Sequence, residues 1–195
     1  MATKSKNLLS TEEIEETEKE LRKAILKNPI DAKAHYNLGN LLVGQNDAKK
    51  LGDGMTELVI ALELKGNLSE DELEYAFNVL KALYEFLWNM RDEAGDKGLY
   101  PAAKLAELYL NVEDGHNALK WLNEEWNARE LLDDYEMAKL NFNFARAYEL
   151  TCEFAQGEQK ILESKELFQR QKMPDMVGLC NETLKELKKS KVKSK

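Results

Sequence analysis

Four residues of this sequence have side chains suited to metal binding or nucleophilic catalysis: His35, His116, Cys152 and Cys180. Zinc sites use histidines and cysteines at close, paired spacing, and neither histidine has a second histidine or cysteine at such a spacing. Both cysteines lie within apolar helical patterns, where a thiol keeps its proton and stays inert. We therefore expect reduced cysteines in the core, His35 as a packed residue, His116 in solvent, and no metal, cofactor or catalytic residue.

The carboxylate pairs and the glycines also give no indication of a catalytic or phosphate-binding site. Acidic pairs such as Glu124 with Glu125 and Asp133 with Asp134 are common in a chain with 36 acidic residues, and they are typical of solvated helix faces and caps. The segment Gly52-Asp53-Gly54 lacks the Lys-Ser/Thr pair and the preceding strand of a phosphate-binding loop. The sequence thus predicts a protein that is not an enzyme.

Composition excludes further classes of function. The formal net charge of −8 disfavours nucleic-acid binding, because surfaces that neutralise phosphates are usually basic. No apolar run reaches the roughly 20 residues that span a bilayer, so we expect no membrane insertion. The reduced cysteines and the polar start of the chain favour a cytoplasmic location. The lysine-rich end, 185–195, is interpreted as a solvated tail, with a nuclear address or contact with an anionic partner as alternatives.

Helical periodicity dominates the chain, and only three prolines and ten glycines interrupt it. Capping boxes and apolar residues at i, i+3, i+4 and i+7 predict about nine helices and no strand. Loops are expected at 44–54 and 95–98. The predicted organisation is a flexible N-terminus (1–9), a single helical-repeat domain (10–188) and a basic flexible tail (189–195). The predicted caps are Ser10 with Glu13, Ser69 with Glu72, and Asp133 with Glu136.

One stretch carries a more specific pattern. His35, Leu38, Gly39 and Leu42 lie on one predicted helix, and Leu58 and Ala61 lie on the next. This stretch, with Ala24 and Pro29 before it, resembles the tetratricopeptide repeat family, whose unit of ~34 residues is an antiparallel helix pair. The resemblance implies an all-α solenoid of helix pairs, in which the two helices cross closely where Gly39 meets Ala61.

Two later stretches repeat the pattern more loosely. Ala106 and Ala145 mark first helices of this kind, 67 and 106 residues after Gly39, and 39 residues apart. The helix order then requires an irregularity in the middle of the array: the segment 69–94 either hides two helices or forms one long, divergent element, which we favour. An unrelated all-helical bundle is the alternative. The matching positions are Leu105, Ala106, Tyr109, Ala118 and Leu122, and Phe144, Ala145, Tyr148, Gly157 and Ile161.

The resemblance also implies a binding surface, because first helices of this family line a concave groove. Asparagines there can bond a peptide backbone, and Lys139 and Arg146 can pair with its acids. Some relatives hold a chaperone's terminal carboxylate in a lysine-asparagine-arginine clamp; here Tyr36 stands where the first lysine would be. The implied groove positions are Lys33, Tyr36, Asn37, Asn40, Ala103, Glu107, Leu110, Asn111, Lys139, Phe142, Asn143 and Arg146.

These observations predict a non-catalytic adaptor or scaffold that binds a peptide or helix of another protein, for example in chaperone or complex assembly. The alternatives are a self-assembling helical protein, which would form homo-oligomers, and a non-catalytic subunit of an enzyme complex. Trp88, Trp121 and Trp126 are either interface anchors or helix-helix core, and core packing is favoured, most clearly for Trp121.

Overall fold

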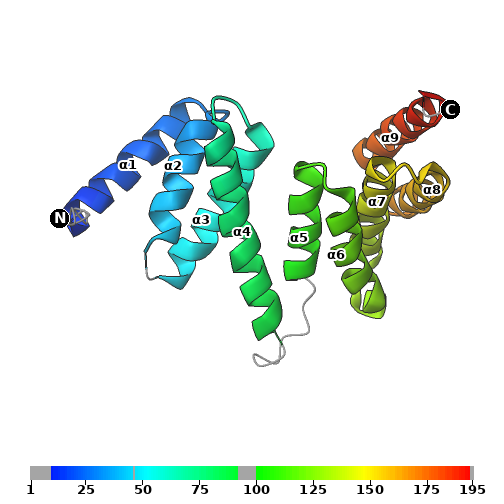
Figure 1. Cartoon of the computed structure of the whole chain (residues 1–195), viewed down its shortest axis with the longest axis horizontal. Helices are drawn as coiled ribbons and strands as arrows, with labels where there is room; N and C mark the ends of the chain where they lie inside the picture. Colours follow the sequence, from blue (N-terminus) through cyan, green and yellow to red (C-terminus); the bar gives the residue numbers. More distant parts are fainter. Residues whose placement is uncertain (1–9, 46, 92–99, 194–195) are drawn as a thin grey trace, which may run out of the picture. The chain divides into compact units, whose positions relative to one another are not determined.

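The computed structural model describes residues 10–45, 47–91 and 100–193. These residues form nine α-helices and one 3-10 turn, and none of them lies in a strand, so the predicted all-α class is confirmed (Figure 1). The predicted break at 95–98 lies outside the described residues, as does the N-terminal segment 1–9. The helices are α1 (Thr11–Lys27), α2 (Ala32–Val43), α3 (Ala48–Leu64), α4 (Glu70–Met90), α5 (Tyr100–Asn111), α6 (Gly115–Asn127), α7 (Asp134–Leu150), α8 (Phe154–Arg170) and α9 (Pro174–Lys193), and the 3-10 turn is η1 (Arg129–Leu131).

The chain divides into two compact units, a first unit that ends at Leu80 and a second unit that begins at Lys81. The boundary lies within α4, so this helix contributes residues to both units. The single domain over 10–188 stays a prediction. The segment 69–94 contains one continuous helix of 21 residues among its described residues, rather than two.

The structure contains the three capping boxes that the sequence predicts at helix starts. At each of three helix starts, a side chain accepts from the backbone N–H three residues on, and the acidic residue there accepts from the backbone of the first. This reciprocal arrangement satisfies two amides that have no partner within the helix. The three pairs are Ser10 with Glu13, Ser69 with Glu72, and Asp133 with Glu136.

Helix α3 begins earlier than the sequence predicts, because part of the expected loop 44–54 is helical. Asp47 caps its start by accepting from the Lys50 amide at 2.9 Å. Gly54 is buried where α3 crosses α2, and a Cβ there would lie 2.9 Å from the Gly39 carbonyl oxygen. The partner of Gly39 in the close crossing is therefore Gly54, with Leu58, and not Ala61 as predicted. The glycines of this segment permit close packing instead of breaking the helix.

Gly52 and Gly54 form a matched pair for testing this packing. Gly54→Ala should lower the free energy of unfolding by about 1–3 kcal/mol, because the new Cβ meets backbone atoms that cannot move aside. Gly52→Ala should raise it by about 0.5–1 kcal/mol, because beyond its own turn of helix backbone no atom lies within 4 Å of the new Cβ, and alanine favours helix. Thermal unfolding followed by circular dichroism measures both. Equal effects of the two substitutions would contradict the assigned crossing.

His35 occupies a buried position on α2, as expected. Its Nδ1 lies 2.5 Å from Oε2 of Glu57, and its Nε2 lies 3.0 Å from the carbonyl oxygen of Pro29. The ring thus connects α2 to α3 and to the turn that follows α1. His116 is exposed on the first turn of α6, which confirms its predicted position in solvent.

In the second unit, the connections α5–α6 and α7–α8 have the same geometry. Two residues after each helix, Glu113 and Cys152 adopt left-handed φ angles of 60° and 59°. The next residue is the N-cap of the following helix, and its N–H bonds the carbonyl five residues back. These positions repeat at the 39-residue interval noted between Ala106 and Ala145. The bonds run from Asp114 to Tyr109 (2.9 Å) and from Glu153 to Tyr148 (2.8 Å).

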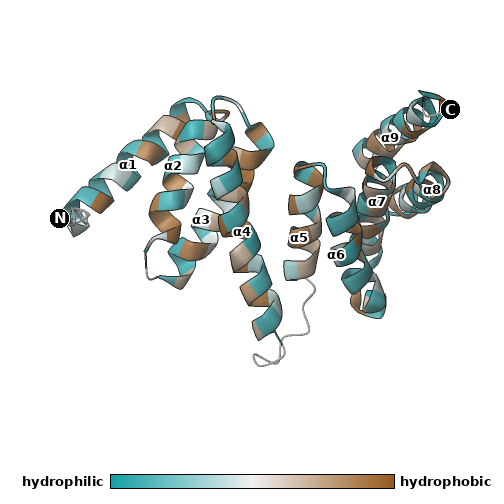
Figure 2. Ribbon diagram, in the orientation of Figure 1, coloured by the Kyte–Doolittle hydropathy of each residue, from teal (hydrophilic) through white to brown (hydrophobic). Residues whose placement is uncertain are grey.

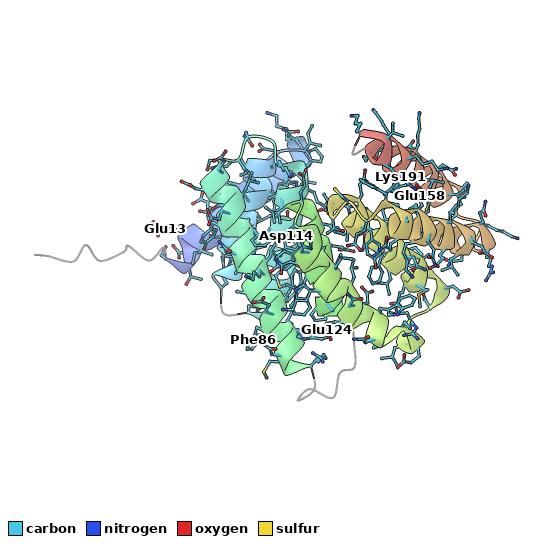
Figure 3. All side chains as sticks on the ribbon, turned by 45° about the vertical axis from the view of Figure 1, so that its right-hand side comes forward. Glu13, Phe86, Asp114, Glu124, Glu158 and Lys191 are labelled. Atoms are coloured by element: carbon cyan, nitrogen blue, oxygen red, sulfur yellow. The ribbon has the colours of Figure 1, made fainter. Side chains whose placement is uncertain are left out.

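Helices α7, α8 and α9 enclose an apolar cluster, which includes Ile161, Phe168 and Leu187. Figure 2 shows hydrophobic and hydrophilic residues interspersed along these helices, as expected where one face is buried. Residues 189–193, predicted in a tail, continue α9. Ser190 there donates to Glu149 at 2.9 Å, and Lys191 pairs with Glu158 at 3.0 Å; the latter two are labelled in Figure 3.

The two cysteines have different surroundings. Cys180 is buried, as predicted, with its Sγ 3.6 Å from Ser164 Oγ, and burial raises its pKa. Cys152 is exposed, so its prediction as a core residue is wrong. The predicted helix continued to Cys152, whereas α7 ends at Leu150 and Cys152 lies in the left-handed turn after it.

The thiols should therefore react in two phases. With a thiol-specific chromogenic reagent at neutral pH, we expect Cys152 to react at once, and Cys180 to react only when denaturant opens the second unit. Cys152→Ser should remove the fast phase and leave the slow one. A fast phase that survives this substitution would contradict the assigned burial.

Within the described residues, no helix is both long enough and apolar enough to cross a membrane.

Candidate functional site

A concave pocket of about 370 Å³ lies within the second unit, between α5, α6, α7 and the connection from α6 to α7. Its volume is at the lower end of the range for ligand pockets. Charged and apolar side chains both line it. The lining residues are Tyr100, Ala103, Lys104, Glu107, Glu125, Leu131, Leu132, Glu136, Lys139, Leu140 and Asn143.

Two helix faces supply most of this lining. The residues from α5 occupy positions i, i+3, i+4 and i+7, and so do the residues from α7. Side chains at this spacing lie on the same face of a helix. Each helix therefore turns one stripe toward the pocket. The stripes are Tyr100, Ala103, Lys104 and Glu107 on α5, and Glu136, Lys139, Leu140 and Asn143 on α7.

Helix α6 contributes Glu125, which is only 6% exposed. It continues the buried face of α6, which carries Ala118, Trp121 and Leu122. The expectation that Glu124 and Glu125 are both solvated is thus wrong for Glu125, whereas Glu124 is exposed. Glu125 follows Trp121 by four residues, and this spacing is the sequence signal that predicts its burial.

The carboxylate of Glu125 has an atom without a partner. Its Oε2 is buried and accepts no hydrogen bond from any residue that the structure describes. Burying a charged oxygen without a partner is costly, because no water or donor replaces its hydration. Burial, with the carboxylates of Glu107 and Glu136 nearby, raises the pKa of Glu125 to about 7, and Lys139 opposes this rise.

The other charged groups of the pocket have assigned contacts. Lys104 Nζ lies 2.6 Å from Glu107 Oε2, and Lys139 Nζ lies 3.6 Å from Glu107 Oε1. Glu136 uses Oε2 to accept from the Asp133 amide at 3.0 Å. Two lysines thus share one carboxylate, and Glu125 is left without an ion pair among the described residues.

Comparison with protein-family models, curated proteins and solved structures found no match to this chain. The assignment of this site therefore depends on its own geometry. Among the described residues, no group of three or more histidines, cysteines or carboxylates has the arrangement of a metal site.

The structure brings part of the predicted groove together. Ala103, Glu107, Lys139 and Asn143 all line the pocket. The remaining predicted residues of the second unit do not: Asn111 and Arg146 are half-buried elsewhere, Leu110 is buried, and Phe142 packs against the apolar cluster of α7, α8 and α9.

The predicted groove residues of the first unit lie on α2. Lys33 forms an ion pair with Glu72, the first-turn acid of α4, and its Nζ also lies 5.6 Å from the centroid of the Tyr36 ring. Tyr36 meets Tyr75 edge-on with 6.4 Å between ring centroids. Asn37 is exposed and Asn40 is half-buried. Lys33 and Tyr36 thus contact α4 within this unit.

All three tryptophans belong to the second unit. Trp121 is buried, as favoured from the sequence, and meets Trp88 edge-on with 5.7 Å between centroids. Trp126 is half-buried and packs edge-on against Phe144 at 6.0 Å. Tryptophan fluorescence therefore reports on this unit.

Replacing Glu125 should change how stability depends on pH. Its folded pKa of about 7 lies above the ordinary value of 4.5, so the folded state binds more protons between these values. The contribution of Glu125 to the free energy of unfolding therefore falls as pH rises from about 4.5 to about 7, and it is constant above that range. The native chain should lose this part of its free energy of unfolding between about pH 5 and about pH 8, whereas Glu125→Gln should not. The difference in free energy of unfolding between the variant and the native chain should therefore shift by about 3 kcal/mol in favour of the variant over that range.

Urea unfolding followed by tryptophan fluorescence measures this difference at both pH values. Glu124→Gln is the matched control, because Glu124 is the neighbouring, exposed carboxylate on the same helix (Figure 3). A stability difference for Glu125→Gln that does not change with pH would contradict the assigned burial.

Proposed function

We propose that this protein is a non-catalytic adaptor that binds a peptide segment of another protein, and that the pocket between α5, α6 and α7 is part of its binding surface. The observation that carries this proposal is the convergence of Glu107, Lys139 and Asn143 on one concave site. The resemblance to the tetratricopeptide repeat family implies the same three positions for a peptide groove.

The chemistry of the pocket suits an extended peptide. Amide side chains can donate to and accept from a peptide backbone, and Asn143 lies at the wall of the pocket. Lys139 is 43% exposed at its side chain, so its ammonium remains accessible to a partner. The apolar side chains Leu131, Leu132 and Leu140 offer contact area beside these polar groups.

We also propose that the second unit consists of helix pairs of the tetratricopeptide type. Two features support this: the similar tight connections α5–α6, α7–α8 and α8–α9, of which the first two lie 39 residues apart, and the contacts of α5 with α7 and of α7 with α9. In a stacked array, each repeat contacts its neighbours, and equivalent helices of neighbouring repeats line one surface.

Selection from a library of random displayed peptides tests the binding function. We expect the immobilised full chain to enrich a consistent sequence motif. Lys139→Ala should weaken the selected peptides about tenfold, the loss typical of one charge-assisted hydrogen bond. Lys188→Ala on α9 is the matched control, because Lys188 is exposed and lies outside the pocket.

Fluorescence anisotropy with labelled copies of the selected peptides gives these affinities. Failure to enrich any motif in repeated selections would overturn the proposal. Equal affinity for the native chain and for Lys139→Ala would exclude Lys139 as a peptide contact.

A further inference from the structure

The burial of the Glu125 carboxylate does not stabilise the fold. Glu125 lies on the buried face of α6, its Oε2 accepts no hydrogen bond from the described residues, and it lines the pocket. Buried carboxylates in native proteins are normally paired or fully hydrogen-bonded. A carboxylate that remains unpaired beside an open cavity fits a site whose missing donor arrives with a ligand.

The charges around Glu125 indicate the sign of that ligand. Glu107 and Glu136 add two further carboxylates to the pocket, and Lys104 and Lys139 supply two ammonium groups, both within ion-pair distance of Glu107. The described lining thus carries three carboxylates and two ammonium groups. Glu136 accepts from the Asp133 amide, whereas Oε2 of Glu125 is buried and accepts no hydrogen bond from the described residues. An anion entering this pocket would meet an uncompensated carboxylate, whereas a cation would neutralise it.

The shape and the apolar lining indicate the length and nature of the cation. Ala103, Leu131, Leu132 and Leu140 present hydrocarbon surface, and Tyr100 presents an aromatic ring. Lysine and arginine side chains combine an apolar stem with a charged end, and they bury the stem along such surfaces. A volume of about 370 Å³ has room for one side chain of this kind.

We propose that the pocket binds the cationic side chain of a lysine or arginine in the bound peptide, and that Glu125 is the carboxylate that accepts its hydrogen bonds. This inference rests on the proposed peptide-binding function. It adds the chemical class of the residue that the pocket recognises. Guanidinium and ammonium groups both donate hydrogen bonds to carboxylates and are stronger donors than neutral groups.

Such binding depends on pH, because the pKa of the unliganded Glu125 is about 7. The cation favours the ionised carboxylate, so the peptide binds more tightly as pH rises from about 6 to about 8, and the affinity becomes level above that. The other charged groups that line the pocket are Lys104 and Glu107 on α5 and Glu136 and Lys139 on α7.

A small probe tests the pocket directly. Nα-acetyl-lysine methylamide is titrated into the isotopically labelled full chain, and amide NMR shifts of α5, α6 and α7 are followed. Nα-acetyl-norleucine methylamide, which has the same stem without the charge, is the control ligand. We expect at least about tenfold weaker binding of the norleucine probe, as for loss of a charge-assisted hydrogen bond.

Glu125→Gln should abolish the preference for the lysine probe and the dependence on pH, whereas Glu124→Gln should retain both. The pH titration of the native chain is a second, independent readout that does not require a variant. Equal shifts with the two probes, or equal binding by the native chain and Glu125→Gln, would overturn the inference.

The peptide library separates this inference from the proposed function. A motif without lysine or arginine, bound equally by Glu125→Gln, overturns the inference and leaves the adaptor function in place. A charge-selective lysine probe combined with no enriched peptide supports the cation pocket and overturns the adaptor function. Enrichment of a basic residue that Glu125→Gln removes supports both.

Discussion

Close approach of helix backbones at glycine is the constraint on which both units depend. In the first unit, Gly39 of α2 and Gly54 of α3 face each other, so that neither position has room for a Cβ. In the second unit, a Cβ at Gly115 would lie 3.0 Å from the Ala147 carbonyl oxygen. Glycine in a helix costs about 1 kcal/mol relative to alanine, and close packing offsets that cost here.

The pocket follows from the same packing in the second unit. Gly115 allows the start of α6 to lie directly on the end of α7, and this contact orients the buried face of α6. Trp121 and Leu122 on that face fill the core, and Glu125 continues it one turn later. The Glu125 carboxylate is therefore buried because it lies on the inner face of α6. One row of side chains from α5 and one from α7 surround it.

Electrostatics then determine what the pocket can do. Glu107 attracts both nearby lysines, and this leaves Glu125 unpaired at a pKa near neutrality. A carboxyl with a pKa near 7 changes its protonation when a nearby charge is added or removed. A partner that brings a positive charge would stabilise the ionised form, so the unfavourable burial in the free protein becomes selectivity for that partner.

The sequence by itself determined the helical class, the three capping boxes, the boundaries of α2 and the buried place of His35, because periodicity and capping act within a few residues. The resemblance to the tetratricopeptide repeat family also implied Glu107, Lys139 and Asn143 as groove residues. The sequence did not determine the early start of α3, because a glycine that permits close packing and a glycine that ends a helix have the same local signature. The pairing of Gly39 with Gly54, the exposure of Cys152 and the isolation of the Glu125 carboxylate were decided only by the tertiary structure. These three features depend on contacts between segments that are far apart in the sequence. The local sequence around each residue does not determine those contacts.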